Sequence, residues 1–250
     1  MPKKIILLAG PTASGKSKLA IQLAKNLNGE IINADSMQIY KEFTTLSSRP
    51  DFNELKKVKH HLYGIISVKK YFSAGQWLKL AKKKINFCYK SKKIPIIVGG
   101  TGLYFNTITR GISKIPHIDL ATRNKVRNLF IKLGYKDFYK KLLKLDSKVK
   151  NKILPTDSQR SQRAYEVFLK TKKSLFDWAN NTKSDFLDFE IDKIYLNIPR
   201  DELLKKISKR TESMFKNDCI EEVKKFNSLN LSSSLSANKL ISVQEINSFL

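Results

Sequence analysis

The sequence contains few of the residues from which disulfide frameworks and metal sites are built. Its 250 residues include two cysteines, Cys88 and Cys219, without paired spacing, and three histidines. His60 and His61 are adjacent, but no cluster of cysteines or carboxylates stands near them in the chain. We interpret them as packing or turn residues rather than metal ligands. The isolated thiols are typical of a reducing compartment, so we expect a soluble cytoplasmic protein.

Long apolar runs and acidic residues are also scarce. The N-terminal apolar run ends at Gly10, which is too short for a signal peptide or a membrane span, and we expect no contact with a membrane. The chain has 22 Asp and Glu against 48 Lys and Arg, a formal net charge of +26. This excess favours a polyanionic partner such as a nucleic acid, although a lysine-biased genome would give the same composition.

The apolar runs that are present alternate with segments of helical periodicity. We expect strands at residues 5–9, 30–35, 94–98 and 193–198, and helices from residue 16 onward, at 73–92 and at 200–216. A hydrophobic content of 41% allows a sizeable core. The alternation predicts an α/β fold in which helices cover both faces of a parallel sheet and ligands bind at the carboxyl ends of the strands.

One stretch interrupts this alternation. Residues 117–189 have helical periodicity and no convincing strand, and between residues 120 and 180 sixteen Lys and Arg stand against five Asp and Glu. We therefore predict an α/β core formed by residues 1–116 and 190–250, with residues 117–189 as a basic helical insertion domain.

The sequence GPTASGKS stands between the first expected strand and the first expected helix. It comprises Gly10, Pro11, Thr12, Ala13, Ser14, Gly15, Lys16 and Ser17. At this spacing the backbone N–H groups of a glycine-rich turn and of a helix N-terminus converge on phosphate oxygens. Lys16 would add a positive charge, and Ser17 a hydroxyl ligand for Mg²⁺. We expect a P-loop NTPase-like fold; a glycine turn that caps the helix without a ligand is the alternative.

The other strand ends bear on which phosphate compound this loop holds. In kinases and ATPases with such a loop, an acidic residue near Mg²⁺ usually closes an apolar strand, but the third strand here runs into GGTGLY. The acid, Asp35, instead follows the second strand in NADSMQIYK. By position alone Asp35 is a general base, a metal ligand or a cap of the next turn. The glycines around Thr101 indicate a second phosphate-binding turn or a tight packing corner.

Six ordered motifs resemble those of the tRNA dimethylallyltransferases. They are GPTASGKS, INADSMQIYK, HHL, YFSAGQW, PIIVGGTGLYF and DSQRSQRAYEV, and the resemblance runs from residue 3 to about residue 225. It implies an enzyme that transfers the dimethylallyl group from dimethylallyl diphosphate to N6 of the adenosine at tRNA position 37, next to the anticodon, and releases diphosphate. The loop would then hold a prenyl diphosphate and not ATP.

The resemblance also implies roles for single residues. Asp35 accepts the adenine proton, and Thr101 and Arg123 meet the diphosphate and the tRNA at the reacting end. The flipped base is held by Ser36, Met37 and Gln38. The loop amides, Lys16 and an Mg²⁺ ion on Ser17 neutralise the departing diphosphate.

Part of the basic insertion has a helical pattern of its own. Arg160 and Arg163 lie three residues apart on one expected helix face, opposite an apolar face with Ala164 and Val167. A solvated basic face is the ordinary interpretation of this pattern. The resemblance instead implies contacts with the tRNA anticodon stem-loop, made by Gln159, Arg160, Ser161, Gln162 and Arg163.

Departures from the family pattern leave alternatives open. A glycine usual near Asn217 and Asp218 is missing, residues 241–243 read Ile-Ser-Val in place of Ile-Gly-Tyr, and the family's further basic, Trp-containing segment is not in the sequence. We expect the chemistry to survive these changes better than tRNA affinity, and we expect a monomer. The alternatives are a P-loop kinase for a small molecule or nucleotide, which explains neither Asp35 nor the basic insertion, and an RNA-binding protein without catalysis.

Overall fold

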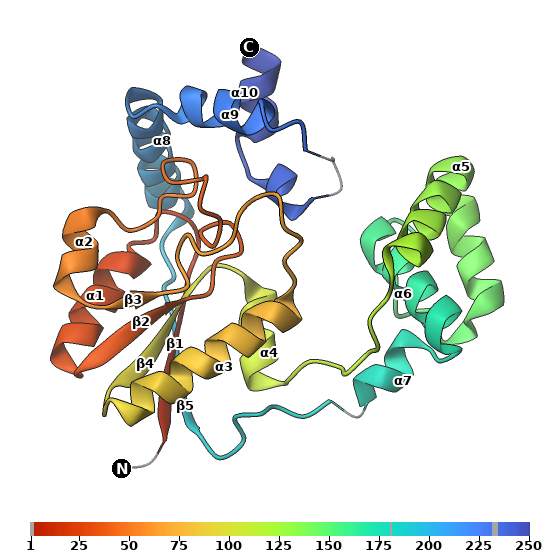
Figure 1. The fold of residues 1–250 in the computed structure, drawn as a ribbon, viewed down its shortest axis with the longest axis horizontal. Coiled ribbons are helices and arrows are strands. Elements are labelled where there is room, and N and C mark those ends of the chain that lie inside the picture. Colours follow the sequence, from red (N-terminus) through yellow and green to blue (C-terminus); the bar gives the residue numbers. More distant parts are fainter. Residues whose placement is uncertain (1–2, 181, 232–234) are drawn as a thin grey trace. The chain divides into compact units, whose positions relative to one another are not determined.

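The computed structural model describes residues 3–180, 182–231 and 235–250. The chain divides into two compact units. The first consists of Met1–Thr109 and Phe186–Leu250, and the second, Arg110–Asp185, is inserted between these two parts. Figure 1 shows the elements of both units, coloured along the chain.

The first unit is a parallel α/β fold. Its strands are β1 (Lys4–Ala9), β2 (Gly29–Asn33), β3 (His60–His61), β4 (Ile94–Gly99) and β5 (Glu190–Tyr195). Its α-helices are α1 (Lys16–Asn26), α2 (Phe52–Lys57), α3 (Ala74–Lys90), α4 (Gly102–Thr109), α8 (Arg200–Lys216), α9 (Cys219–Asn227) and α10 (Val243–Phe249). The strands form one sheet in the order β3-β2-β4-β1-β5, and every pair is parallel. This confirms the expected fold class.

Both faces of the central strands are buried. Ile6 and Leu8 of β1 pack with residues of α1 in one cluster, whereas Ile5 and Leu7 pack with residues of α3 and α4 in another. Since successive side chains of a strand point to opposite faces, a strand that is covered on both sides becomes a continuous apolar run. The runs therefore identify β1, β2 and β4 in the sequence, and Figure 1 shows the helices that cover them.

The edge strands are harder to find in the sequence. The prediction of a strand at 193–198 is wrong in its bounds, because β5 begins at Glu190 and ends at Tyr195. Glu190 and Asp192 lie next to Lys4 of β1, at 3.4 Å and 2.8 Å from its Nζ. The charged residues Glu190 and Asp192 thus lie at the start of β5, ahead of the run from residue 193 on which the prediction was based. β3 was not predicted, since two residues show no periodicity.

The second unit has only helical regular structure in its described part, and it begins and ends earlier than the predicted insertion of residues 117–189. It contains α5 (Leu120–Leu145), a 3₁₀ turn (Ser147–Val149), α6 (Ser158–Thr171) and α7 (Leu175–Asn180). Phe138 and Leu142 of α5 pack against Ala164 and Tyr165 of α6 in a core of its own. Gly134, with φ of 67°, bends α5. No helix described in either unit is long and apolar enough to cross a lipid bilayer.

Candidate active site

The loop between β1 and α1 has the backbone of an anion-binding turn. Gly15, which precedes α1, has φ of 83°, and no side chain caps this helix. The N–H groups of the first turn therefore lack a side-chain partner and combine with the positive end of the helix dipole to attract anions. The Nζ of Lys16 donates to the carbonyl oxygen of Pro11 at 2.9 Å, which holds its charge beside the loop.

The loop side chains differ in exposure. Thr12 and Ser17 are exposed, so the Ser17 hydroxyl in the first turn of α1 is accessible to a ligand. Ser14 is buried, and its Oγ has no hydrogen-bond partner in the part of the chain that the structure describes. A Cβ on Gly10 would lie 2.9 Å from that oxygen and 3.1 Å from the Cβ of Leu196. A side chain at position 10 would therefore crowd Ser14 and Leu196, and glycine avoids this.

Asp35 lies directly after β2 in a turn that its own side chain stabilises. Its Oδ1 accepts from the N–H of Met37 at 2.9 Å and, more weakly, from that of Gln38 at 3.4 Å. The Asn33 side chain holds the backbone of Asp35 on both sides, because its Oδ1 accepts from the Asp35 N–H and its Nδ2 donates to the Asp35 carbonyl. Asp35 therefore does cap the turn, but this uses one oxygen and leaves Oδ2 for other partners.

The end of β4 reaches the same turn. The Oγ1 of Thr101 accepts from the N–H of Ser36 at 2.9 Å and lies 3.3 Å from the Ser36 hydroxyl. A Cβ on Gly99 would lie 2.1 Å from the carbonyl oxygen of Ala34, so only glycine allows this approach. Gly99 is thus part of a tight packing corner, one of the two interpretations that the sequence left open, and the corner brings Thr101 to Asp35.

Two partly buried cations share the surroundings of Asp35. Burial lowers the pKa of Lys16 below its ordinary value of 10.5; Asp35 opposes this shift, whereas Arg210 adds to it. Burial also lowers the pKa of Arg210, again opposed by Asp35. Two cations near one carboxylate leave an excess of positive charge in a poorly hydrated place, which an anion would neutralise.

Arg210 is a candidate site residue that the sequence did not reveal. It stands on α8, more than a hundred residues along the chain from the loop, in a helix where most basic residues are exposed. Arg210 differs from its neighbour in burial: Lys209 is exposed and Arg210 is half-buried. This difference depends on how α8 packs, and the amphipathic periodicity of the sequence alone does not predict it.

Aromatic rings form a wall beside Asp35. Trp77 and Tyr104 stack with centroids 4.3 Å apart, and the indole N–H of Trp77 donates to the carbonyl oxygen of Asn33. Burial, with a contribution from Asp35, raises the pKa of the Tyr104 hydroxyl above its ordinary range. Trp77 and Tyr104 are buried, as the sequence predicts for core or pocket wall, so they are not exposed platforms for stacking a base.

The remaining expected site residues belong to the second unit. Arg123 is half-buried in the first turn of α5. Gln159 and Arg160 are exposed in the first turn of α6, and the Nη1 of Arg160 lies 3.2 Å from a carboxylate oxygen of Asp157. Ser161 is buried, with 1% of its surface exposed, so it cannot touch an RNA in this conformation. The expected contact of Ser161 with the anticodon stem-loop is therefore wrong. Gln162 and Arg163, also expected to contact the stem-loop, are partly exposed.

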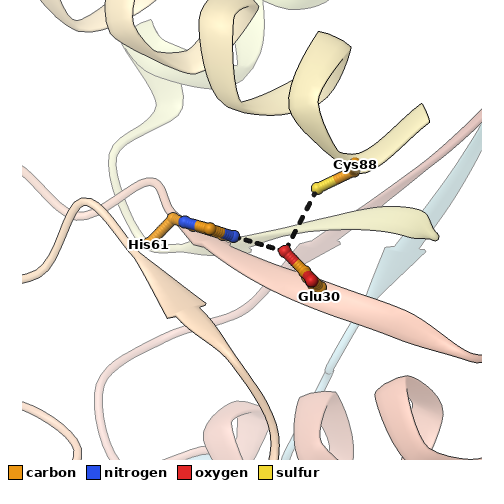
Figure 2. Close-up of side chains that lie close together, drawn as sticks. All are labelled: Glu30, His61 and Cys88. Atoms are coloured by element: carbon orange, nitrogen blue, oxygen red, sulfur yellow. Dashed lines mark hydrogen bonds and ion pairs between the residues drawn. The ribbon is translucent and has the colours of Figure 1, made fainter. Parts of the chain in front are cut away.

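Figure 2 shows a buried cluster that the sequence did not reveal. The Nε2 of His61 lies 2.5 Å from Oε2 of Glu30, and the Cys88 thiol donates to the same oxygen at 3.8 Å. A carboxylate and a cysteine thus do stand beside the histidine pair. Ligands of one tetrahedral zinc ion, each about 2.0–2.3 Å from the metal, would be more than about 3 Å apart. The 2.5 Å separation is that of a hydrogen bond, and the cluster is hydrogen-bonded as it stands.

Comparison with known proteins finds a matching family model and similar sequences. A family model described as IPP transferase matches residues 38–250. The tRNA dimethylallyltransferase of Pelagibacter ubique (strain HTCC1062) is 52% identical over 247 residues, which cover 99% of this chain and 79% of the relative. That of Rickettsia felis (strain ATCC VR-1525 / URRWXCal2) is 41% identical over 249 residues, 99% of this chain and 81% of the relative.

Two solved structures are similar as well. The full-length tRNA isopentenylpyrophosphate transferase of Bacillus halodurans has a TM-score of 0.68 at 28% identity, over 99% of this chain and 77% of that one. A eukaryotic dimethylallyltransferase acting on tRNA has a TM-score of 0.77 at 26% identity, over 94% of this chain and 58% of that one.

Proposed function

The chain belongs to the IPP transferase family, and we propose that it transfers the dimethylallyl group from dimethylallyl diphosphate to a tRNA. In this reaction the bond between the allylic carbon and the diphosphate oxygen breaks, a bond from that carbon to an adenine nitrogen forms, and the nitrogen loses a proton. The observation that carries the proposal is the grouping of Lys16, Arg210 and Asp35 beside a glycine-rich anion-binding loop.

The diphosphate is the part of the substrate that the loop fits. An allylic diphosphate ionises readily once its leaving group is neutralised, so donors and cations around that group supply most of the catalysis. We assign this task to the loop of residues 10–17, to Lys16 and to Arg210. The depressed pKa values of both side chains support the assignment, since an anion bound between them would offset the cost of burying their charges.

The same place suits a magnesium ion. Mg²⁺ takes oxygen ligands, keeps several waters and is usually held by one or two protein oxygens together with substrate phosphates. The exposed hydroxyl of Ser17 in the first turn of α1 offers such an oxygen next to the loop. When bound, the ion would add positive charge to the leaving diphosphate. Lys16 and the loop amides would still orient that group.

Asp35 is the proton acceptor in this proposal. An adenine amino group is a weak nucleophile, and a carboxylate that accepts its proton as the new bond forms assists the attack. The turn suits proton acceptance, because Oδ1 of Asp35 accepts from the N–H of Met37 while Oδ2 is available to the adenine amino group. Transfer of the dimethylallyl group to N6 of the adenosine at position 37 requires this base to leave the anticodon stack. We assign the flipped base to Ser36, Met37 and Gln38, beside Thr101.

The second unit would bind the rest of the tRNA. Arg160 and Gln159 are exposed on α6 and offer guanidinium and amide donors suited to unstacked bases and phosphates of the anticodon stem-loop. Gln162, Arg163 and Arg123 are further proposed contacts. The formal net charge of +26 supports a polyanionic substrate. A protein with these substrates would act in the cytoplasm, and we expect it to work as a monomer.

A direct assay tests the proposal. The purified protein is incubated with Mg²⁺, labelled dimethylallyl diphosphate and an anticodon stem-loop RNA whose adenosine stands next to the anticodon. Label should enter this RNA, and no label should enter an otherwise identical RNA with guanosine at that position. Excess ATP should compete poorly with dimethylallyl diphosphate. Phosphoryl transfer from ATP without any prenyl transfer would instead establish the kinase alternative.

A further inference from the structure

Glu222 of α9 makes an unusual set of contacts away from the anion-binding loop. Its Oε1 accepts from the N–H groups of Thr44 and Thr45 at 2.8 Å and 2.7 Å, and its Oε2 accepts from the N–H of Leu46 at 3.0 Å. Three consecutive backbone donors thus converge on one carboxylate. Hydrogen bonds to an ionised acceptor are among the stronger ones in proteins. Glu222 therefore fixes the backbone of residues 44–46 as a unit.

A second contact from α9 secures the same segment. The ring of Phe226, one helical turn after Glu222, lies 5.0 Å from the ring of Phe43, and both are buried. Ser47 is buried too, and its hydroxyl donates to the carbonyl oxygen of Phe43. We call residues 43–48 the clamp loop. Its conformation depends on α9 at both its start and its middle.

The clamp loop in turn fixes the side chain of Gln38. The Nε2 of Gln38 donates to the carbonyl oxygens of Ser47 at 3.0 Å and Ser48 at 2.8 Å. A glutamine amide has two N–H donors, so both are used, and a flipped amide would set its oxygen against two carbonyls. The Oε1 of Gln38 therefore stays an acceptor with a fixed orientation.

Gln38 belongs to the turn that presents Asp35. The backbone N–H groups of Met37 and Gln38 both point to Oδ1 of Asp35. A fixed amide oxygen in that turn can accept a hydrogen bond from the amino group of adenine, and it offers no donor to a carbonyl group at the same place. The orientation of one amide thus bears on which base the turn accepts.

We propose that Glu222 is a positioning residue for the base: it holds the clamp loop, which locks the Gln38 amide with its oxygen available to the adenine amino group. The proposal rests on the proposed prenyl transfer to adenosine. Glu222 itself contacts backbone and does not touch the reacting atoms. Its effect should therefore appear in the reaction of the base and not in the binding of dimethylallyl diphosphate.

The test uses two adjacent carboxylates of α9. Glu222→Gln keeps the shape of the side chain but loses the charge and one acceptor oxygen. Glu221→Gln is the control, because Glu221 is exposed and its carboxylate accepts from Lys224 on the same helix. Both variants are compared with wild type by single-turnover prenyl transfer to the stem-loop RNA, by calorimetric titration with dimethylallyl diphosphate and by thermal unfolding.

Glu222→Gln should slow single-turnover transfer by about tenfold to a hundredfold, the range that a misplaced substrate group can cost, with unchanged affinity and stoichiometry for dimethylallyl diphosphate. Glu221→Gln should match wild type. If Glu222 acts through Gln38, the double variant with Gln38→Ala should be no slower than Gln38→Ala alone. A purely structural role would instead reduce the titrated stoichiometry, or its effect would multiply with that of Gln38→Ala.

Two failures can be told apart. A wild-type rate in Glu222→Gln, or slowing that multiplies with Gln38→Ala, overturns the role of Glu222 and leaves the prenyl transfer intact. A wild-type protein that transfers no prenyl group to any stem-loop RNA overturns the proposed function, and the role of Glu222 in positioning the base falls with it.

Discussion

Thr101 and Ser36 join the ends of two neighbouring parallel strands: the Thr101 hydroxyl oxygen accepts a hydrogen bond of 2.9 Å from the Ser36 N–H. One residue before Ser36 is Asp35, and one residue before Thr101 is Gly100, where an added Cβ would lie 3.8 Å from Oδ2 of Asp35. A side chain at position 100 would therefore contact Oδ2 of Asp35, and glycine keeps this side of the carboxylate free of one.

Asp35→Asn should reduce prenyl transfer without disturbing the turn. The asparagine oxygen can still accept from the Met37 N–H, whereas the proton acceptor is lost. We expect turnover to fall by about 10²-fold or more, the usual contribution of a general base, with tRNA affinity nearly unchanged. Single-turnover kinetics and filter binding measure the two quantities. Asp51→Asn is the control, because the Asp51 side chain also accepts from a backbone N–H, as the N-cap of α2. Near wild-type rates in Asp35→Asn would remove the base role.

Arg210→Ala should weaken the diphosphate site. If Arg210 neutralises the bound and the departing diphosphate, its loss should raise the KM for dimethylallyl diphosphate and lower the transfer rate. We expect kcat/KM to fall by about 10²-fold. Lys209→Ala, an exposed neighbour on α8, should have little effect. Steady-state kinetics with varied dimethylallyl diphosphate decide the matter. Equal kcat/KM in the two variants would show that Arg210 has only a packing role.

Gly99→Ala should destabilise the first unit. Its methyl carbon would lie 2.1 Å from the carbonyl oxygen of Ala34, which is backbone and cannot rotate away. Forced overpacking typically costs about 1–3 kcal/mol, and the shift would also move Asp35. Gly102→Ala is the matched control, since a Cβ there meets nothing within 4 Å. Urea unfolding of both variants gives the comparison, and equal free energies of unfolding would contradict the tight corner.

The pH dependence of stability should reveal the buried histidine. Burial lowers the pKa of His61 below its ordinary value of 6.5, against the opposing effect of Glu30, while Lys84 and Lys59 lower it further. The unfolded chain therefore binds more protons than the folded chain around and below pH 6.5, so stability should fall as the pH drops through this range. The slope for one proton is at most about 1.4 kcal/mol per pH unit.

Urea unfolding between pH 7.5 and 5 measures this slope for wild type and for His61→Gln, whose amide can still donate to Glu30. The slope should be smaller in His61→Gln than in wild type. Identical slopes in wild type and His61→Gln would rule out His61 as the group that titrates.

The sequence predicts those parts of the fold and site that depend on neighbouring residues. Two-sided burial makes β1, β2 and β4 apolar runs, and the position of Asp35 and Thr101 directly after two of them predicts that they meet. Arg210 and Glu222 could not be found this way, because their contacts join α8 and α9 to segments more than a hundred residues earlier. Their roles depend on which side of a charged helix is buried, and packing determines that.

The two arginines of α6 should affect RNA binding differently. Arg160 is exposed and pairs with Asp157, so Arg160→Gln should raise the KM for the stem-loop RNA and reduce the slope of log affinity against log salt by about 0.7 per lost phosphate contact. Arg163 pairs at 3.2 Å with Glu166, whose side chain is 10% exposed. Arg163→Gln would leave that carboxylate buried without its cation, and we expect a loss of stability in addition.

Fluorescence titrations of the stem-loop RNA at several salt concentrations, together with thermal unfolding, separate the two effects. Lys83→Gln on α3 is the control for loss of one charge, because Lys83 is exposed in the first unit. A salt slope in Arg160→Gln equal to that of Lys83→Gln would mean that Arg160 is solvated and does not meet the RNA. A lower unfolding temperature in Arg163→Gln without any change in RNA affinity would assign that arginine to the stability of α6 alone.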